Sequence, residues 1–397
     1  MLGPDFMLSR IFLIILSFGL AACVPLGAPP TDTKNSLQSA SPQIDAGYLL
    51  SGRAIFGRVL DGGDLPEQEL ISASPSMMAF LEQLSPNAPL NIRWAELVSR
   101  FNRDQFVVEY DAQTTLSAAE TFQLKTGNCL AVTMLLVSLT RELGIKAYFN
   151  QVETPQLWKL EDEQTLVNYR HINMVAEVPY GRKVVDFGLA EYDPTMYQQR
   201  ISDRAAFSQY YSNRAMEVMR ADGDREYAFK LMQKALQLAP GDSDIWLNLG
   251  ALYKRFGLNT EAEQSYLLAI QLDSHNTAAL SSLSRLYGES GNDELAAEYN
   301  VRAHAIRNEA PSLLYYRAKK DYDRGNFLEA LTLLNRAAEN SREDHRVYFL
   351  LGKTEFKLGR LAESKRHLVK AFDLLDDQSL IPAYQRELND LQNSVSL

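Results

Sequence analysis

The sequence predicts two folds in succession: an α+β domain over residues 47–205 and an all-α solenoid of repeats over residues 206–397. Two observations carry this prediction. In the first region, a strongly apolar helix-like segment is followed by short strand-like runs. In the second, glycine and alanine recur at a fixed period, which is typical of repeat architectures. The chain has 397 residues, 46% of them hydrophobic and 23% charged, which is the composition of a globular protein.

An apolar run near the N-terminus predicts a secretory signal. Arg10 precedes the run at 11–20, and small residues follow it, in the basic, apolar and cleavage order of a signal peptide. The run is shorter than the roughly 20 residues that span a bilayer. It ends in the sequence LAAC, whose last residue is Cys23, and this ending resembles the lipobox of bacterial lipoproteins.

The lipobox resemblance implies removal of residues 1–22 and lipidation of Cys23. An ordinary cleaved signal with an incidental cysteine is the alternative. Val24, where an aspartate would retain a lipoprotein, implies the outer membrane. Residues 23–46 are rich in Pro, Ser, Thr and Gly and predict a flexible tether. We therefore expect the body of the protein to face the periplasm, anchored to the membrane by acyl chains only.

The charge balance makes a nucleic-acid partner unexpected. The chain has 40 basic and 50 acidic residues, a net charge of −10, and its three regions each hold more acidic than basic residues. Binding to phosphate backbones requires a basic surface. The sequence also contains no HExxH, paired Cys-x-x-Cys or calcium-loop motif, so no metal or other cofactor is implied.

Small residues recur at a spacing of 34 in the C-terminal region. The glycines of the series are Gly223, Gly257, Gly291, Gly325 and Gly359. The alanines are Ala235, Ala269, Ala303, Ala337 and Ala371. Such spacing lets paired helices pack closely, with glycine at the turn between them. The block from Trp246 to Ala269 resembles the tetratricopeptide signature, which implies five repeats from about 207 to 378 and a capping helix over 380–394.

The tetratricopeptide resemblance implies a concave groove, lined by the first helix of each repeat, that binds extended peptides. The residues at the groove positions are mostly basic or aromatic: Lys254, Arg255, Arg285, Tyr315, Lys319, Tyr322, Arg346, Phe349, Lys353, Phe356 and Lys357. They predict a groove for acidic peptides or for a peptide's terminal carboxylate, with aromatic anchors. A solvated helix face with ordinary Lys and Arg density is the alternative.

Cys129 stands at the predicted start of the apolar helix. The turn at 126–128 ends in Asn128, which can cap a helix that begins at Cys129 and ends near Gly144. A cysteine in the first helical turn faces the positive end of the helix dipole, which favours the thiolate. With Cys23 lipidated, Cys129 has no disulfide partner, so it is either a buried small hydrophobe or a reactive thiol.

Three strand-like runs follow at 146–152, 168–178 and 184–188. The second contains His171 and the third contains Asp186, fifteen residues later. A tight turn at Tyr180-Gly181 would pair Asp186 with Val175, about 13 Å along the strand from His171, so a bulge or twist would be needed to join the two.

The Gly-Asn-Cys helix start, the strand histidine and the later aspartate resemble the transglutaminase-like superfamily, over roughly 95–195. The resemblance implies a papain/transglutaminase-like domain in which Cys129 is the nucleophile, His171 the general base and acid, and Asp186 the residue that orients the histidine. Gln123, six residues before the cysteine, stands where papain-like enzymes carry their oxyanion glutamine, and Asn128 or a backbone N–H is the alternative for this role.

The resemblance implies a thiol acyltransferase or hydrolase to which the repeats deliver a peptide or protein partner. Leu130 and Asn173 stand where members of the family often carry aromatic residues. Structural roles stay open for each triad residue: a core thiol, a hydrogen-bonded structural histidine and a strand-end cap. The alternative function is a non-catalytic envelope scaffold whose repeats bind partner proteins and whose triad domain is inactive.

Overall fold

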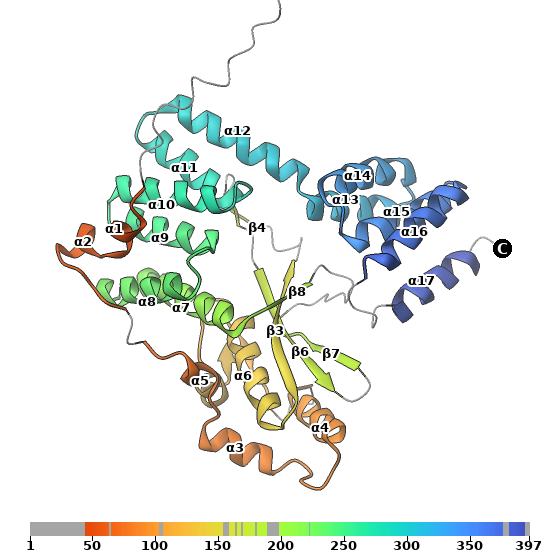
Figure 1. Ribbon diagram of the computed structural model, residues 1–397, viewed down its shortest axis with the longest axis horizontal. Coiled ribbons are helices and arrows are strands. Elements are labelled where there is room, and N and C mark those ends of the chain that lie inside the picture. The colour runs from red at the N-terminus through yellow and green to blue at the C-terminus, as the bar shows by residue number, and fades with distance from the viewer. Residues whose placement is uncertain are drawn as a thin grey trace, which may run out of the picture. The chain divides into compact units, whose positions relative to one another are not determined.

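The computed structural model is shown in Figure 1. The residues it describes are 44–62, 65–102, 106–153, 159–162, 165–167, 170–178, 181–188, 198–221, 223–375 and 381–393. Ile44–Leu397 form one compact unit. The predicted signal peptide, Cys23 and the tether up to residue 43 lie outside the described residues. Among the described helices, none is long and apolar enough to span a bilayer.

Short helices come first in the described chain. They are α1 Ala46–Leu50, α2 Arg53–Phe56, the 3-10 helix η1 Gln68–Ile71, α3 Pro75–Glu82 and α4 Leu90–Asn102. The segment around α1 packs on the repeats, because the Gln233 side-chain amide donates hydrogen bonds to the carbonyls of Leu50 (2.6 Å) and Leu60 (3.0 Å). The first described segment is therefore held by the first repeat.

An antiparallel sheet of four strands, in the order β7-β6-β3-β8, follows in the chain. Its strands are β3 Lys146–Glu153, β6 Arg170–Val178, β7 Gly181–Val185 and β8 Gln198–Ile201. Two smaller pairs are parallel β1 Glu109–Tyr110 with β2 Thr126–Gly127, and antiparallel β4 Lys159–Asp162 with β5 Thr165–Val167. The first region thus combines helices with strands, as predicted.

The helix that begins at Cys129 packs against the two central strands of this sheet. This helix, α6 Cys129–Glu142, contacts β3 and β6, and its residues Leu130–Thr140 are all buried. The Thr133 hydroxyl donates a hydrogen bond to the Ile172 carbonyl (3.1 Å), which fastens α6 to β6. The predicted apolar helix is confirmed. Its short neighbour α5 Ala118–Leu124 precedes it.

The register of β6 and β7 brings Asp186 nearer to His171 than the sequence predicts. Met174 lies opposite Val185, so continuing the ladder by one pair sets Asp186 beside Asn173. The expected pairing was wrong by two residues, because the chain reverses one residue earlier than the expected turn. Asp186 therefore lies diagonally across from His171, within reach of a side-chain hydrogen bond.

Among its described residues, the second region consists of five helix pairs and a terminal helix (Figure 1). The pairs are α7 Asp203–Arg220 with α8 Arg225–Leu238, α9 Ser243–Arg255 with α10 Asn259–Leu272, α11 Thr277–Glu289 with α12 Asp293–Glu309, α13 Pro311–Asp323 with α14 Phe327–Asn340, and α15 His345–Lys357 with α16 Leu361–Asp373. The terminal helix is α17 Ile381–Asn393. The periodic alanines are all fully buried, and the last four periodic glycines have φ between 75° and 83° at the turns between paired helices. The predicted all-α solenoid is confirmed.

The described residues form two hydrophobic cores. The larger core is one cluster of buried residues that lie between Leu49 and Leu286, and it includes residues of α6, the sheet and the first three repeats. The smaller core comprises repeats four and five together with Tyr384 of α17. The expected domain boundary near residue 205 therefore lies inside one continuous core.

Candidate functional site

Cys129 is the first residue of α6 and is half-buried. The side-chain oxygen of Asn128 accepts the N–H of Ala131 (3.0 Å), and the Asn128 carbonyl accepts the N–H of Val132 (3.1 Å). The first N–H groups of an α-helix have no partner within the helix, and Cys129 and Leu130 occupy these first positions of α6. Asn128 therefore caps the helix as predicted, and the helix begins at the residue that carries the thiol.

His171 and Asp186 form a buried hydrogen-bonded pair. Nε2 of His171 lies 2.7 Å from Oδ2 of Asp186, and the two side chains are 4% and 7% exposed. Asp186 occupies Nε2, which leaves the other ring nitrogen, Nδ1, for the neighbouring Cys129; Cys129 and His171 line the same cavity. The three residues that the sequence singled out are brought together around one imidazole.

A chain of amide side chains supports Asp186 within the sheet. Nδ2 of Asn173 donates to Oδ2 of Asp186 (3.1 Å), and Nδ2 of Asn150 donates to Oδ1 of Asn173 (3.0 Å) and to Oε1 of Gln198 (2.8 Å). Both asparagines are buried. The sequence signal for Asn173 was its place two residues after His171, on the same face of the strand.

The surroundings of His171 favour its charged form. Burial lowers the pKa of His171, but hydrogen bonds to Asp186 and Cys129, and the negative charges of both, outweigh burial and raise it to about 9. The imidazole is therefore expected to be protonated at neutral pH. A protonated histidine beside a cysteine stabilises the thiolate and can give its proton to a leaving group.

Cys129 and His171 line a large cavity of about 1330 Å³. One wall comes from the loop before α5 and from residues beside the triad. The rest of the lining comes from the repeats, with residues of α7 and of the chain segments that lead into α9, α11, α13 and α15. The thiol therefore faces a space that the repeat array helps to enclose.

The structure departs from the predicted set of site residues at two positions, Gln123 and Tyr110. Gln123 is exposed on α5 and is not among the residues that line the cavity, so this structure does not bring its amide to the thiol. Tyr110 does line the cavity, and its ring packs on Gly188, where a Cβ atom would lie 2.8 Å from the ring. Burial, and to a lesser extent the charge of Cys129, raise the pKa of Tyr110. No motif marked Tyr110 in the sequence.

The predicted basic and aromatic groove is largely engaged in contacts within the chain. Arg346 is 3% exposed and pairs with Asp344 (2.6 Å), and Phe349 is buried, with its ring stacked on Tyr384 of α17 at 3.7 Å. Neither side chain is therefore exposed in a groove as expected. Arg346 is paired with Asp344, the N-cap residue of α15, and Phe349 is covered by Tyr384 of the capping helix α17. Lys254 pairs with Glu289 on the next repeat (2.5 Å).

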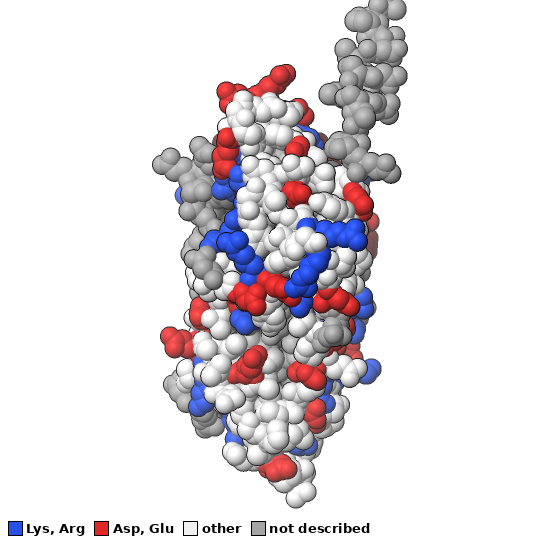
Figure 2. Space-filling view, turned by 90° about the vertical axis from the view of Figure 1, so that its left-hand side faces the viewer, with Lys and Arg blue, Asp and Glu red and all other residues white. Residues whose placement is uncertain are grey.

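The remaining groove positions vary in exposure. Arg255, Arg285 and Lys319 are exposed, with Lys319 3.6 Å from Asp323. The others are half-buried: Tyr315, Tyr322, Lys353, Phe356 and Lys357. Of all the predicted groove residues, Arg346 is the one that lines the cavity at Cys129. Figure 2 shows basic and acidic side chains side by side across one face of the molecule, with no large area of a single charge there.

The arrangement is suited to nucleophilic chemistry on a carbonyl group. It supplies a thiol, an imidazole that is oriented by a carboxylate, and N–H groups at a helix start that can stabilise an oxyanion. Within the described part of the chain, no cluster of three His, Cys, Asp or Glu side chains is placed to hold a metal ion.

Comparisons with known proteins identify the repeats. Two family models described as tetratricopeptide repeat match residues 231–264 and 315–364, so the chain contains tetratricopeptide repeats. Among solved structures, the chain is similar to the MamA protein, with 20% identity over 42% of this chain and 91% of that one (TM-score 0.23). It is similar to YrrB, described as a TPR protein with an unusual peptide-binding site, with 19% identity over 45% and 92% of the two chains (TM-score 0.23). It is also similar to BtubC from P. vanneervenii, with 18% identity over 43% and 81% (TM-score 0.25). No curated protein matches the chain.

Proposed function

We propose that this protein is a thiol enzyme that transfers or hydrolyses acyl groups, with Cys129 as its nucleophile. The observation that carries the proposal is that the buried imidazole of His171 is hydrogen-bonded to Asp186 and lies with Cys129 at one cavity. In this arrangement an imidazole activates a thiol and is itself oriented by a carboxylate. The resemblance of residues 95–195 to the transglutaminase-like superfamily agrees with this assignment.

The first chemical step forms an acyl-enzyme. The Cys129 thiolate attacks the carbonyl carbon of an amide or ester, and the N–H groups of Cys129 and Leu130 stabilise the oxyanion. As the tetrahedral intermediate collapses, the C–N or C–O bond breaks and His171 gives its proton to the departing amine or alcohol. The product of this step is a thioester on Cys129.

The second step releases the acyl group. Neutral His171 takes a proton from water or from an amine, which attacks the thioester carbonyl. The C–S bond breaks, and the thiolate and the imidazolium of His171 are restored. Water gives hydrolysis, whereas an amine gives acyl transfer.

The size and walls of the cavity favour a peptide or protein as the substrate. Its volume of about 1330 Å³ exceeds the roughly 300–1,000 Å³ of pockets for small molecules. Tetratricopeptide arrays present extended surfaces for protein–protein contact. We propose that the repeats bind the partner and lead an acyl-bearing segment to Cys129.

We further propose that the chain is a lipoprotein of the outer membrane, attached through Cys23 and facing the periplasm. The support is the signal-like N-terminus and the LAAC sequence that ends in Cys23. Lipidation of Cys23 would account for the free thiol of Cys129 in an oxidising compartment, because it leaves Cys129 no other cysteine in this sequence to pair with. Metabolic labelling with a palmitate analogue, compared between the wild type and Cys23→Ser, tests this proposal.

The enzyme proposal is tested with a chain that starts at residue 24, which keeps the whole compact unit Ile44–Leu397 and has Cys129 as its sole cysteine. The probe is p-nitrophenyl acetate. We expect a burst of p-nitrophenol equal to the enzyme concentration and an acetyl group on Cys129 by mass spectrometry. Cys129→Ser and His171→Ala should abolish the burst. His304→Ala is the matched control, because His304 is exposed on α12 outside the cavity.

The non-catalytic scaffold is the other outcome of this experiment. Its specific support is the pair of tetratricopeptide matches at 231–264 and 315–364. A wild-type protein that is not acetylated on Cys129, and whose binding of partner proteins is unchanged in His171→Ala, would favour the scaffold and overturn the enzyme proposal.

A further inference from the structure

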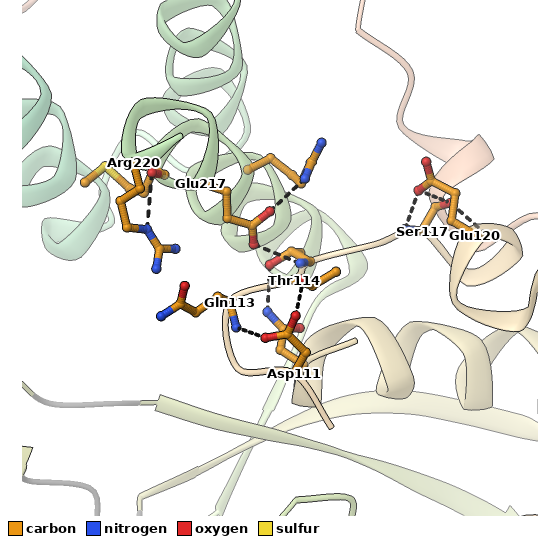
Figure 3. Close-up of polar contacts among 11 residues, drawn as sticks. Asp111, Gln113, Thr114, Ser117, Glu120, Glu217 and Arg220 are labelled. Atoms are coloured by element: carbon orange, nitrogen blue, oxygen red, sulfur yellow. Dashed lines mark hydrogen bonds and ion pairs between the residues drawn. The ribbon is translucent and has the colours of Figure 1, made fainter. Parts of the chain in front are cut away.

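A carboxylate of the first repeat reaches the loop that supports the Cys129 helix. Oε1 of Glu217, on α7, accepts the backbone N–H of Thr115 at 2.8 Å, and the two residues are 102 positions apart in the chain. Figure 3 shows Glu217 and Arg220 of α7 facing the loop that carries Asp111, Gln113 and Thr114. The contact joins the repeat array directly to the thiol site.

The link continues from Thr115 to the cap of α6. The Thr115 hydroxyl accepts a hydrogen bond from Nδ2 of Asn128 at 2.6 Å, and the side-chain oxygen of Asn128 accepts the N–H of Ala131 at 3.0 Å. An asparagine amide has its acceptor on one side and its donors on the other. Thr115, by holding the donor side, keeps the acceptor side pointed at the helix start next to Cys129.

The loop itself is braced so that a movement of Thr115 would be passed on. Oδ1 of Asp111 accepts the N–H of Gln113 (2.9 Å), and Oδ2 accepts the Thr114 hydroxyl (2.5 Å). The Thr114 carbonyl accepts the N–H of Asn128 (2.8 Å). Two hydrogen bonds from Asn128, the cap of α6, therefore join the loop to the helix start. Glu217 of α7 holds the same loop from the repeat array.

Glu217 is placed to act as a fixed acceptor. Its side chain is 11% exposed, and its second oxygen accepts a hydrogen bond from Arg214 at 2.7 Å on the same helix. Thr115 is fully buried, so its N–H loses its acceptor if the carboxylate is removed. The expected response is a shift of the loop, because an unsatisfied buried N–H is unfavourable.

We propose that Glu217 is a positioning residue for the thiol site, so that the first repeat is part of the working enzyme and not only a binding module. This inference rests on the proposed function, since it concerns the reactivity of Cys129. It predicts that Glu217 acts through Thr115 and Asn128 on the helix start that holds the thiol and the oxyanion-binding N–H groups.

The test uses two probes on the chain from residue 24. Iodoacetamide is a small neutral reagent that reports the reactivity of Cys129, and p-nitrophenyl acetate reports acylation. We expect Glu217→Ala and Thr115→Val each to lower both rate constants by about tenfold, since displacing reacting groups by about 1 Å can cost up to about a hundredfold in rate. The double variant should be no slower than the slower single variant, because both changes break one chain of contacts.

Matched variants separate positioning from general damage. Arg214→Ala removes the ion pair on α7 but leaves the Glu217 acceptor for Thr115, so both rates should stay within about threefold of the wild type. Glu217→Gln keeps an oxygen that can accept the Thr115 N–H, and it should recover most of the loss. Thermal unfolding of each variant checks that the fold is retained at the assay temperature.

Each outcome decides a different claim. Unchanged rates in Glu217→Ala, equal losses in Arg214→Ala and Glu217→Ala, or multiplicative losses in the double variant would each overturn the positioning role. A wild-type protein that is alkylated but never acetylated would remove the proposed function alone. In that case the response of alkylation to Glu217→Ala would still decide whether the repeat positions the thiol.

Discussion

Replacing Asp186 with asparagine removes the carboxylate whose hydrogen bond, and to a lesser extent whose charge, raises the pKa of His171. The asparagine keeps the size of the side chain and an oxygen for the ring N–H. The contact from Asn173 can also be kept, so the local packing should change little. In this variant burial would still lower the pKa of His171, and Cys129 would be the remaining group that raises it.

The magnitude follows from the pKa of His171. With a pKa of about 9, about 90% of the imidazole is protonated at pH 8. If the pKa returns to the ordinary value of about 6.5, the protonated fraction falls to about 3%, a loss of about 30-fold. A step in which His171 must donate a proton should slow by a similar factor at pH 8. It should slow little at pH 6, where the histidine is mostly protonated in both proteins.

The assay is an NMR titration of the imidazole C2 proton, with His171 assigned by comparison with His171→Gln. The chain has five histidines, so the signals can be resolved. The rate of acylation by an acetyl anilide, whose departing amine requires a proton, is measured in parallel at pH 6 and pH 8. A His171 midpoint near 6.5 in the wild type, or the same midpoint in Asp186→Asn, would refute the reasoning, because the carboxylate would not then control the imidazole.

Three further predictions concern stability. Because folding raises the pKa of His171 from about 6.5 to about 9, this residue should add up to about 3 kcal/mol to the free energy of unfolding. The contribution should be complete below pH 6.5 and lost as the pH rises through about 9. Urea unfolding at both ends of this range should show the loss in the wild type and not in His171→Gln. Gly250→Ala should destabilise the second repeat by about 1–3 kcal/mol, because a Cβ atom would lie 2.5 Å from the Tyr266 ring, and a lower urea midpoint measures this. Phe349→Ala should cost about 3–5 kcal/mol in the smaller core, where its ring stacks on Tyr384; hydrogen exchange should rise in α15 and α17 and stay unchanged in α6.

The repeats could be predicted from the sequence because their physical requirements recur. The turns between paired helices at Gly257, Gly291, Gly325 and Gly359 need a positive φ, and the close helix contacts at the periodic alanines exclude larger side chains. The start of α6 was predictable for a similar reason, since turn residues, a capping asparagine and an apolar run are all local signals.

The groove and the supporting contacts could not be predicted in the same way. Position in a repeat gives the face on which Phe349 lies, but not that α17 covers that face through Tyr384. The contact between Asp186 and His171 depends on the register of β6 and β7, for which the pairing expected from the sequence was wrong by two residues. The contact between Glu217 and Thr115 joins two regions with no shared periodicity, so no local pattern reveals it.

The packing of the chain gives a reason why a repeat helix contributes to the thiol site. The larger core includes α6, the sheet and the first three repeats, while repeats four and five pack with α17 in a separate core. Helix α7 is therefore joined to the Cys129 helix by a shared buried core as well as through Glu217 and Thr115. Removing the chain after residue 205 would expose the repeat-facing side of that core and take away the acceptor of a buried N–H. The unit to be tested for chemistry is for this reason the triad region together with the repeats.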